Sequence, residues 1–453
     1  MEIKLFAKTD IDPLDLASLA AGNCYQDKIP EIGKRLNIKD KLFDVGHHTT
    51  IQHHAATFGL EGVAVGDITF GMHLASPFYN SDQRSGRYCA KMFLEPDYGK
   101  IESYVKEFWP DISNNALVLA MDYIKTGVDI YHSNIGAATE IAGNFVAEER
   151  PFASSVIKGN IPKYAQEQMR MFISVIFPTA LIFTVNNGAL AAMYESAWTP
   201  AMKHITEEMA RLYTEKYPET SFMFNKERRR KSDWATTIKD IPPREIKYKP
   251  SLELLNIFGE ENFSPPDSDI MHPVDKLRFT PEMMENSIGD IKTKIEISVA
   301  TMGQDQRHRT ISRGVPKFTG NFYAPPILKK LNLEKKALEI MNRWFEASKV
   351  APNTLAMVLA PYGAMVSYVK SGSFNATAHE QAKRLCWSAQ EEIYHLGRLQ
   401  RLAIEKKISK KSHILSLFEP PCYKNGVCSE GDRYCGRNRE LRKTGDYFPE
   451  RKI

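Results

Sequence analysis

The chain has 453 residues, of which 43% are hydrophobic and 25% are charged, and its formal net charge is +5 at pH 7. This length favours two or three folded units, and the composition excludes a disordered or collagen-like chain. The charge is too small to predict a nucleic-acid-binding protein by itself. The first residues lack the apolar core of a signal peptide and no long uncharged apolar run follows, so we expect a soluble, cytoplasmic protein without a membrane contact. Six cysteines in a chain of this length argue against a disulfide framework.

The hydrophobic pattern of the first half predicts both strands and helices. A strand is expected over 3–7, a helix over 13–24, and strand-like runs over 55–60 and 68–74. A mostly helical region then extends over 163–213, where apolar residues recur at helix-like spacings.

The second half has a similar order of predicted elements. A strand is expected over 294–302, and an amphipathic helix with apolar residues three and four apart over 385–403. The segment between the halves is rich in proline and charge and includes the basic run 226–231, for which a solvated face is favoured over a phosphate contact. We therefore divide the chain into a first domain at 1–216, a linker at 217–273, a second domain at 274–415 and a cysteine-containing tail at 416–453.

Several common catalytic signatures are absent from the sequence. It contains no P-loop, no glycine-rich dinucleotide motif after a strand, no nucleophile elbow, and no His-Glu-x-x-His or Cys-x-x-Cys motif. If the protein is an enzyme, we expect its chemistry to come from a bound cofactor.

Two polar segments combine residue types that suit an anion. Ser85-Gly86-Arg87-Tyr88 offers a hydroxyl group, an open backbone and a guanidinium group, although a plain polar turn has the same composition. Arg307-His308-Arg309 lies in the segment 304–309 directly after a predicted strand and suits a pyrophosphate, although it is also typical of a charged loop. A cluster of four histidines leaves two interpretations open, a metal site or ordinary hydrogen-bonded histidines at the start of a strand: His47, His48, His53 and His54.

Together these segments resemble the flavin-dependent thymidylate synthases. That family carries Arg-His-Arg, then seven residues, then Ser and Gly/Gln-Arg-Tyr, with a His-x-Thr/Ser-x-x-Glu-His stretch upstream. Residues 47–58 resemble the upstream stretch, with Gln52 in place of its glutamate. Arg-His-Arg is intact only in the second half, because Ala-Ser-Pro stands at 75–77 in the first half. The Ser-Gly-Arg sequence occurs at the family position only in the first half.

Other positions of the family divide between the halves in the same way. Arg170 and Asn186 keep the family's spacing of sixteen residues in the first half, whereas Met357 and Ser373 stand at these positions in the second. The late arginine of the family, five residues before Ala-Gln-x-Glu-Ile, corresponds to Arg384. The glutamine three residues before Arg-His-Arg corresponds to Gln304.

The resemblance implies an α+β protein made of two tandem copies of this α/β fold, each an antiparallel sheet with long helices, which form a pseudo-dimer. It implies an enzyme, a methyltransferase that converts dUMP to dTMP with methylenetetrahydrofolate and NADPH at a composite site between the halves. A homodimer of this chain would be equivalent to the homotetramer of the family.

The resemblance also implies roles for particular residues. FAD would be bound by one set of side chains: His47, Thr49, Asn186, Arg307, His308 and Arg309. The nucleotide would contact a second set: Gln83, Ser85, Gly86, Arg87, Arg170, Gln304, Arg307 and Arg384. Of these, Arg384 and Gln304 would lie at the uracil ring, where a guanidinium group stabilises developing negative charge. Gly188 and Asn375 replace a second helix arginine that contacts the flavin in the family.

The tail forms a separate motif, with three cysteines in the spacing C-x5-C-x6-C. Cys422, Cys428 and Cys435, with His413, would suit a tetrahedral zinc ion, and reduced thiols in a packed tail are the other interpretation. Alternatives for the whole protein are a nucleotide- or flavin-binding relative with a regulatory role and a pyrimidine-nucleotide hydroxymethylase. Nucleic-acid binding by the basic run and the tail carries little weight.

Overall fold

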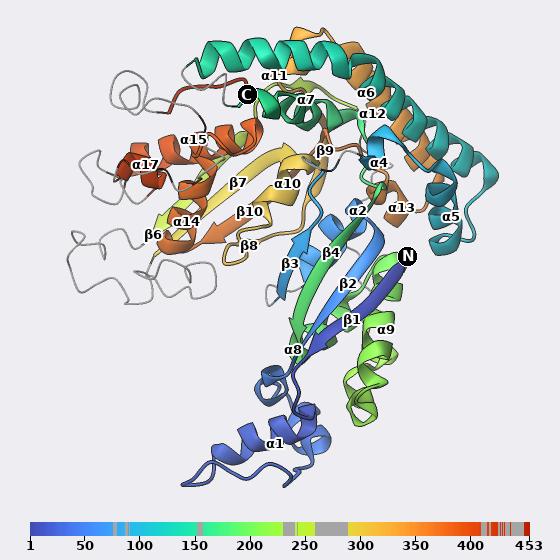
Figure 1. The fold of residues 1–453 in the computed structure, drawn as a ribbon, viewed down its shortest axis with the longest axis vertical. Coiled ribbons are helices and arrows are strands. Elements are labelled where there is room, and N and C mark those ends of the chain that lie inside the picture. The colour runs from blue at the N-terminus through green and yellow to red at the C-terminus, as the bar shows by residue number, and fades with distance from the viewer. Residues whose placement is uncertain are drawn as a thin grey trace.

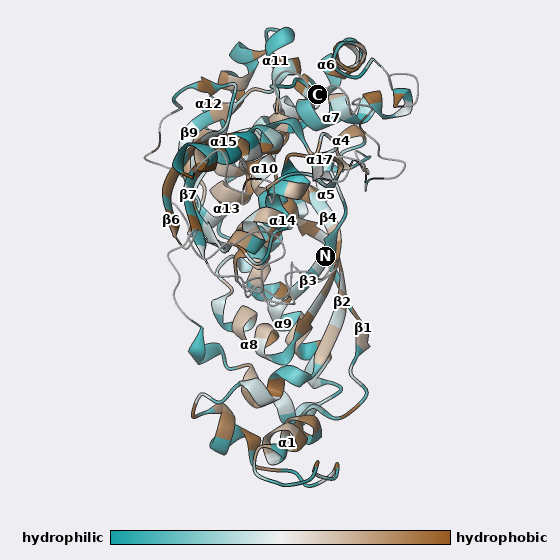
Figure 2. Ribbon diagram, turned by 90° about the vertical axis from the view of Figure 1, so that its left-hand side faces the viewer, coloured by the Kyte–Doolittle hydropathy of each residue, from teal (hydrophilic) through white to brown (hydrophobic). Residues whose placement is uncertain are grey.

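The structure is a computed structural model of the whole chain. It describes residues 1–75, 79–86, 89, 91–151, 157–229, 241, 243–258, 289–408, 415, 418–424, 426, 428, 430, 435 and 448–453. In Figures 1 and 2 the molecule is elongated, with α1 (Pro13–Asn23) at one end and α6 (Asn114–Glu149) and α11 (Pro326–Lys330) at the other. No helix within the described ranges is long and apolar enough to cross a membrane.

The first half contains an antiparallel sheet of four strands. Their order across the sheet is β1 (Glu2–Lys8), β2 (Ala55–Ala64), β4 (Pro178–Asn186) and β3 (Tyr79–Gln83). In β4 the residues that face the helices are buried and alternate with partly exposed ones, which is the period-two pattern of a sheet with one covered face.

The second half contains a sheet of six strands that lies beside the first (Figure 1). Its main path runs β6 (Ser251–Phe258), β7 (Asp290–Ser298), β10 (Ala364–Gly372), β9 (Lys317–Tyr323) and β5 (Ile246–Lys247). The short strand β8 (Ser312–Arg313) also pairs with β10. The four strands β6, β7, β10 and β9 follow the same spatial order as β1, β2, β4 and β3 do in the first sheet.

Helices occupy corresponding places in the two halves. Between the third and fourth strands lie α6 and α7 (Ile161–Met169) in the first half, and α12 (Glu334–Val350) and α13 (Asn353–Val358) in the second. After the fourth strand come α8 (Asn187–Ser196) and α9 (Pro200–Thr214), and then α14 (Phe374–Arg384) and α15 (Glu391–Lys407). The remaining described helices are α2 (Val65–Asp67), α3 (His73–Ala75), α4 (Lys91–Leu94), α5 (Tyr98–Phe108), α10 (Val299–Asp305), α17 (Pro421–Lys424), η1 (Lys39–Phe43), η2 (Thr49–His53), η3 (Ile68–Met72), η4 (Lys158–Asn160), η5 (Arg170–Phe172), η6 (Pro218–Met223) and η7 (Lys226–Arg228).

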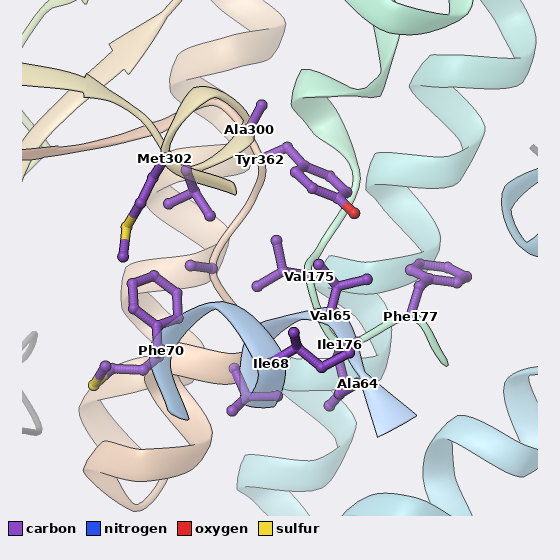
Figure 3. Packing of buried hydrophobic residues seen from close by; sticks show 14 of the residues in the cluster. Ala64, Val65, Ile68, Phe70, Val175, Ile176, Phe177, Ala300, Met302 and Tyr362 are labelled. Atoms are coloured by element: carbon purple, nitrogen blue, oxygen red, sulfur yellow. The ribbon is translucent and has the colours of Figure 1, made fainter. Parts of the chain in front are cut away.

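The two halves share one apolar core. Figure 3 shows side chains of the first half, such as Ile68 and Val175, packed with Ala300 and Tyr362 of the second. Backbone hydrogen bonds cross the same boundary: the Val175 amide donates to the Ala360 carbonyl at 2.8 Å, and the Tyr362 amide donates to the Ile173 carbonyl at 2.9 Å. The long helix α6 also packs against α12. Burial of a continuous apolar surface therefore holds the halves together.

The helix expected at 13–24 is confirmed, and its start has a clear cause. The Asp12 side chain accepts hydrogen bonds from the Leu14 and Asp15 amides, at 2.9 and 3.3 Å, and Pro13 occupies the first turn. Both features are favourable at a helix N-terminus.

Several expected elements differ from the structure. The strand expected at 68–74 is helical, as η3 and α3, because a short, fully buried apolar run has no periodicity that separates strand from helix. The strand expected at 294–302 ends at Ser298, whose side chain accepts a hydrogen bond from the Thr301 amide and begins α10. The helix expected at 385–403 starts at Glu391, and α14 precedes it.

The segment 217–273 was expected to be a linker, but parts of it belong to the second sheet. Strand β6 pairs with β7, and β5 pairs with β9. The partly buried side chains of β6 alternate with exposed ones, as suits an edge strand. The charged residues of this segment made the alternation hard to recognise in the sequence, so no strand was predicted there.

Candidate active site

The first half contributes a cluster around Gly86, just after β3. Gln166 of α7 donates to the Gly86 carbonyl at 2.9 Å. A Cβ atom added to Gly86 would lie 3.4 Å from Arg170 Nη1 and 3.7 Å from the Tyr362 hydroxyl, so this backbone closely approaches both side chains. The structure thus brings the expected residues Gly86 and Arg170 together, next to Ser85. The expected residue Arg87 lies outside the described residues.

Arg170 lies beneath this turn and is only 5% exposed. Its Cζ atom is 4.9 Å from the centroid of the Tyr362 ring, which belongs to the second half. Burial raises the pKa of Tyr362, and the positive charge of Arg170 opposes that rise. A buried cation against an aromatic face is a suitable partner for an anionic group.

The Arg-His-Arg motif of the second half lies against strand β3 of the first. Arg307 Nη1 donates to the Ser81 carbonyl at 3.1 Å, and Arg309 Nη2 donates to the same oxygen at 3.1 Å. Arg309 Nη1 donates to Asn80 Oδ1 at 3.0 Å. Strand β3 ends at Gln83, two residues before Ser85, so one short segment links the two motifs.

His308, between the two arginines, is buried and points away from water, with 4% of its surface exposed. Neither of its ring nitrogens has a hydrogen-bond partner within the described part of the chain. Burial and the nearby Arg384 charge hold the pKa of His308 well below its usual value, so the ring is neutral. A buried imidazole without partners is uncommon and marks a place where a ligand can supply them.

A buried ionic network fixes the loop that carries this motif. Arg313 Nη1 donates to the carbonyls of His308 and Ile311, at 2.9 and 2.7 Å. Lys370 Nζ donates to Asp305 Oδ1 at 2.8 Å, and Arg313 pairs with the same carboxylate. Burial alone would raise the pKa of Asp305, but Arg313 and Lys370 hold it well below the usual range. The loop is therefore tied to β8 and β10.

Gln304 and Arg384 meet in the second half. Arg384 Nη2 donates to the Gln304 carbonyl at 2.5 Å, and the Gln304 side-chain amide donates to Gln390 Oε1. Gln390 directly precedes α15, as its N-cap residue, in the Ala-Gln pair that the sequence singled out. The two residues assigned to the uracil ring are thus neighbours.

A buried carboxyl group lies at the start of the last long helix of each half, α15 in the second half and α9 in the first. Glu392 of α15 accepts hydrogen bonds from the Ser298 amide at 2.7 Å and from Thr301 Oγ1 at 2.5 Å, and burial raises its pKa to about 7. In the first half, Asp67 accepts from the Thr199 hydroxyl at 2.6 Å and from the Tyr104 hydroxyl at 2.7 Å, and burial raises its pKa to about 6. In the second half the buried carboxyl group, Glu392, belongs to the long helix α15 itself. In the first half it belongs to Asp67 of α2, directly after β2.

Of the remaining residues assigned to FAD, one lines a cavity of about 270 Å³ at the start of α8. Asn186 lines it, and its Oδ1 atom accepts a hydrogen bond from the Ala189 amide at 2.7 Å. His48 and Gln52 also line the cavity, whereas His47 and Thr49 are exposed near it and are not among the lining residues. A Cβ atom on Gly188 would lie 2.7 Å from Gln52 Cγ, so Gln52 fills the space beside this glycine.

The histidine cluster and the tail contain no metal site among the described residues, where no group of three or more candidate ligands gathers. His54 is buried and satisfied instead: Tyr213 Oη lies 2.9 Å from its Nδ1 atom, and its Nε2 atom lies 3.0 Å from the Thr9 carbonyl. Cys435 is buried against Leu385 and Trp387, and His413 lies outside the described residues. Zinc binding by the tail stays a prediction.

Sequence reasoning missed several residues of the site. His73 stacks on Tyr79 with ring centroids 5.5 Å apart, and burial and the charges of Arg307 and Arg309 lower its pKa to about 3. Tyr362 and Gln166 contact Arg170 and Gly86 from other elements. No motif spacing points to these residues, because tertiary contacts alone bring them to the site.

Residues 4–219 match the family model described as "Thymidylate synthase complementing protein". The matched region makes up slightly less than half of the chain. The match confirms the resemblance to flavin-dependent thymidylate synthases, and it covers the half that carries Ser85, Gly86 and Arg170. No curated protein matches the chain.

Two solved structures of a flavin-dependent thymidylate synthase, ThyX from Helicobacter pylori, are similar to part of the chain. Both contain FAD and dUMP. One is 17% identical, covers 50% of this chain and 98% of its own, and has a TM-score of 0.31. The other is 18% identical, covers 50% of this chain and 97% of its own, and has the same TM-score.

Flavin is the cofactor that the thymidylate synthase family implies, and the residues present fit it. His308 has two buried ring nitrogens that find no partner among the described residues, and the cavity at α8 offers Asn186 and Gln52. Arg307 and Arg309 add guanidinium groups, which suit phosphate oxygens. Gly188 stands where the resemblance implies an arginine, so one expected contact is missing.

Proposed function

We propose that the protein is a flavin-dependent thymidylate synthase with a composite active site between its two halves. The observation that carries this proposal is the contact of Arg307 and Arg309, from the second half, with Asn80 and Ser81 of the first. The Arg-His-Arg motif thereby adjoins the strand that leads to Ser85 and Gly86. The match of residues 4–219 to the family model supports the reaction type.

The internal repeat supports the composite site. The shared strand order and the matching helices favour two copies of one unit, with a first copy at 1–216 and a second whose sheet begins at β5 and β6. Each copy keeps the residues that the other has lost. One chain then holds one complete set, and a dimer of chains would hold two.

The phosphate of dUMP would bind where Gly86 and Arg170 meet. Arg170 is preorganised there, because it is buried against Tyr362 and so loses little freedom when it binds an anion. Ser85 and Arg87 would add hydrogen-bond donors, and Gln83 would lie nearby. The uracil ring would extend toward Gln304 and Arg384 of the second half, where the guanidinium group stabilises charge on a ring oxygen.

FAD would bind between Arg307, His308 and Arg309 and the cavity at α8, with Asn186, His47 and Thr49 on the first-half side. Bound flavin supplies the redox chemistry for such a reaction, with NADPH as reductant and methylenetetrahydrofolate as carbon donor. The chain's own groups orient the nucleotide and exclude water from it.

Incubation of the purified protein with dUMP, methylenetetrahydrofolate, NADPH and FAD, followed by mass analysis of the nucleotide, tests the proposal. We expect dTMP, and a bound flavin that absorbs near ~450 nm. A hydroxymethylated product would indicate the hydroxymethylase instead. Binding of FAD and dUMP without turnover would support the regulatory relative, and failure to bind either molecule would refute the proposal. Light scattering would measure whether the chain is a dimer.

A further inference from the structure

Three residues of the segment 448–453 are buried between the two halves, although the segment lies far from the site residues in the sequence. Figure 1 places this end of the chain beside α7, between α6 and α15. Phe448, Arg451 and Ile453 are each 5% exposed or less. We call residues 448–453 the C-terminal clasp.

The clasp contacts the first half through its backbone. Glu149 at the end of α6 accepts hydrogen bonds from the amides of Lys452 and Ile453, at 2.6 and 3.3 Å. Arg150 Nη2 donates to the Ile453 carbonyl at 2.7 Å, and Gln168 Nε2 donates to the Lys452 carbonyl at 2.6 Å. These contacts hold the clasp on α6 and α7.

The clasp also contacts α15 of the second half. The Tyr394 hydroxyl donates to the Pro449 carbonyl at 2.8 Å, and Arg398 Nε donates to the Phe448 carbonyl at 2.6 Å. The Arg451 amide donates to His395 Nε2 at 3.2 Å. One short segment therefore binds helices from both halves.

The side chain of Arg451 reaches the loop between α14 and α15. Its Nη1 atom donates to the Trp387 carbonyl at 2.5 Å, and its Nη2 atom donates to the Ala389 carbonyl. The guanidinium carbon lies 4.8 Å from the centroid of the Tyr394 ring. Burying an arginine is costly, and these two carbonyls and the ring offset part of that cost, while its Nε atom has no partner among the described residues.

The two carbonyls stand on either side of Ser388, directly before Gln390. Gln390 accepts a hydrogen bond from Gln304, and Arg384 precedes the same loop and contacts Gln304. Arg451 thus contacts the loop on one side, and the loop contacts the two expected uracil-binding residues on the other. A planar guanidinium group that donates to two carbonyls of the same loop fixes that loop better than a single donor does.

We propose that Arg451 is a positioning residue, which sets the 387–390 loop so that Gln304 and Arg384 face the nucleotide. This role rests on the proposed function for its effect on dUMP. The effect on the loop itself does not depend on that function.

The test compares Arg451→Met, Arg451→Lys and the control Lys452→Met. Lys452 lies in the same clasp, but its side chain makes an exposed ion pair with Glu148, and its backbone contacts would remain. Each variant is measured for dUMP affinity, for melting temperature and for amide hydrogen exchange of peptides covering 385–392 and 299–305. The wild-type protein is measured in parallel.

We expect Arg451→Met to weaken dUMP binding roughly tenfold to a hundredfold, because small displacements of positioning groups have effects of this size. Exchange should rise in both peptides, Arg451→Lys should restore part of the affinity, and Lys452→Met should match the wild type. Unchanged exchange over 385–392 in Arg451→Met would overturn the positioning role. A lower melting temperature with unchanged dUMP affinity in the folded fraction would also overturn it.

The two proposals fail in different ways. If the wild-type protein binds no dUMP, the proposed function fails, and the exchange measurement alone then decides whether Arg451 sets the loop. If dUMP binds normally to Arg451→Met, the positioning role fails while the proposed function stands.

Discussion

Arg309 of the second half lies over the ring of Tyr79 of the first half, with its Cζ atom 5.1 Å from the ring centroid. Another stack runs in the opposite direction, with Arg170 of the first half over Tyr362 of the second. Each half therefore provides an arginine that contacts an aromatic ring of the other.

The Arg309–Tyr79 pair should contribute measurable coupling between the halves. We expect a double-mutant cycle with Arg309→Met and Tyr79→Leu to give a coupling of about 1 kcal/mol, the magnitude of a partly desolvated cation–π contact. Urea unfolding of the four proteins measures it. A control cycle of Tyr79→Leu with Arg211→Met, an exposed residue paired with Glu208, should show additive effects. Additivity in the first cycle as well would contradict this prediction.

Glu392→Gln should flatten the dependence of stability on pH. Burial raises the pKa of Glu392 to about 7, whereas an unfolded glutamate ionises near ~4.3. Between these values the folded state binds the proton and the unfolded state does not, so the free energy of unfolding falls as pH rises toward 7. A glutamine keeps the shape without this proton. Urea unfolding at several pH values measures the slope, and an unchanged slope would count against the assignment.

Two glycines of α6 should respond in opposite ways to alanine. A Cβ atom on Gly127 would lie 2.4 Å from the Phe172 carbonyl oxygen, so Gly127→Ala should destabilise the protein by about 1–3 kcal/mol through overpacking. Gly136 has no atom within 4 Å of such a Cβ, and Gly136→Ala should stabilise the helix by up to about 1 kcal/mol. Thermal unfolding compares them, and equal effects would disprove the close approach at Gly127.

Arg170→Met should remove phosphate recognition and leave nucleoside recognition. We expect the affinity for dUMP to fall by at least about tenfold, since a charge-assisted pair with phosphate is lost. The affinity for deoxyuridine, which has no phosphate, should change little. Calorimetric titration with both ligands measures the difference. An equal loss for both would indicate damage to the fold rather than to a phosphate site.

The fold was predictable where local signals were strong. The helix after Asp12 has a capping side chain and a proline at its start, and both can be read from the sequence. The 36-residue helix α6 was not foreseen, because its polar and apolar residues mix over a long span and its stability comes from packing on α7 and α12. Strand β6 was obscured by the charged residues around it.

The site was predictable only where a family motif marks a residue. Gly86, Arg170, Gln304 and Arg384 come from such motifs, and the structure places Gly86 by Arg170 and Gln304 by Arg384. No sequence motif marks Tyr362, because its role depends on the tertiary contact with Arg170 of the other half. The same holds for Arg451, which is distant in sequence from the loop it grips.

The backbone hydrogen bonds from Val175 to Ala360 and from Tyr362 to Ile173 lie inside a core common to both halves. Parts that are joined in this way stay at a fixed, high local concentration however dilute the protein becomes. A site shared between separate chains is lost when they dissociate, whereas a site completed within one chain survives dilution. A mutation that weakens the contact between the halves therefore cannot separate them, because they belong to one chain.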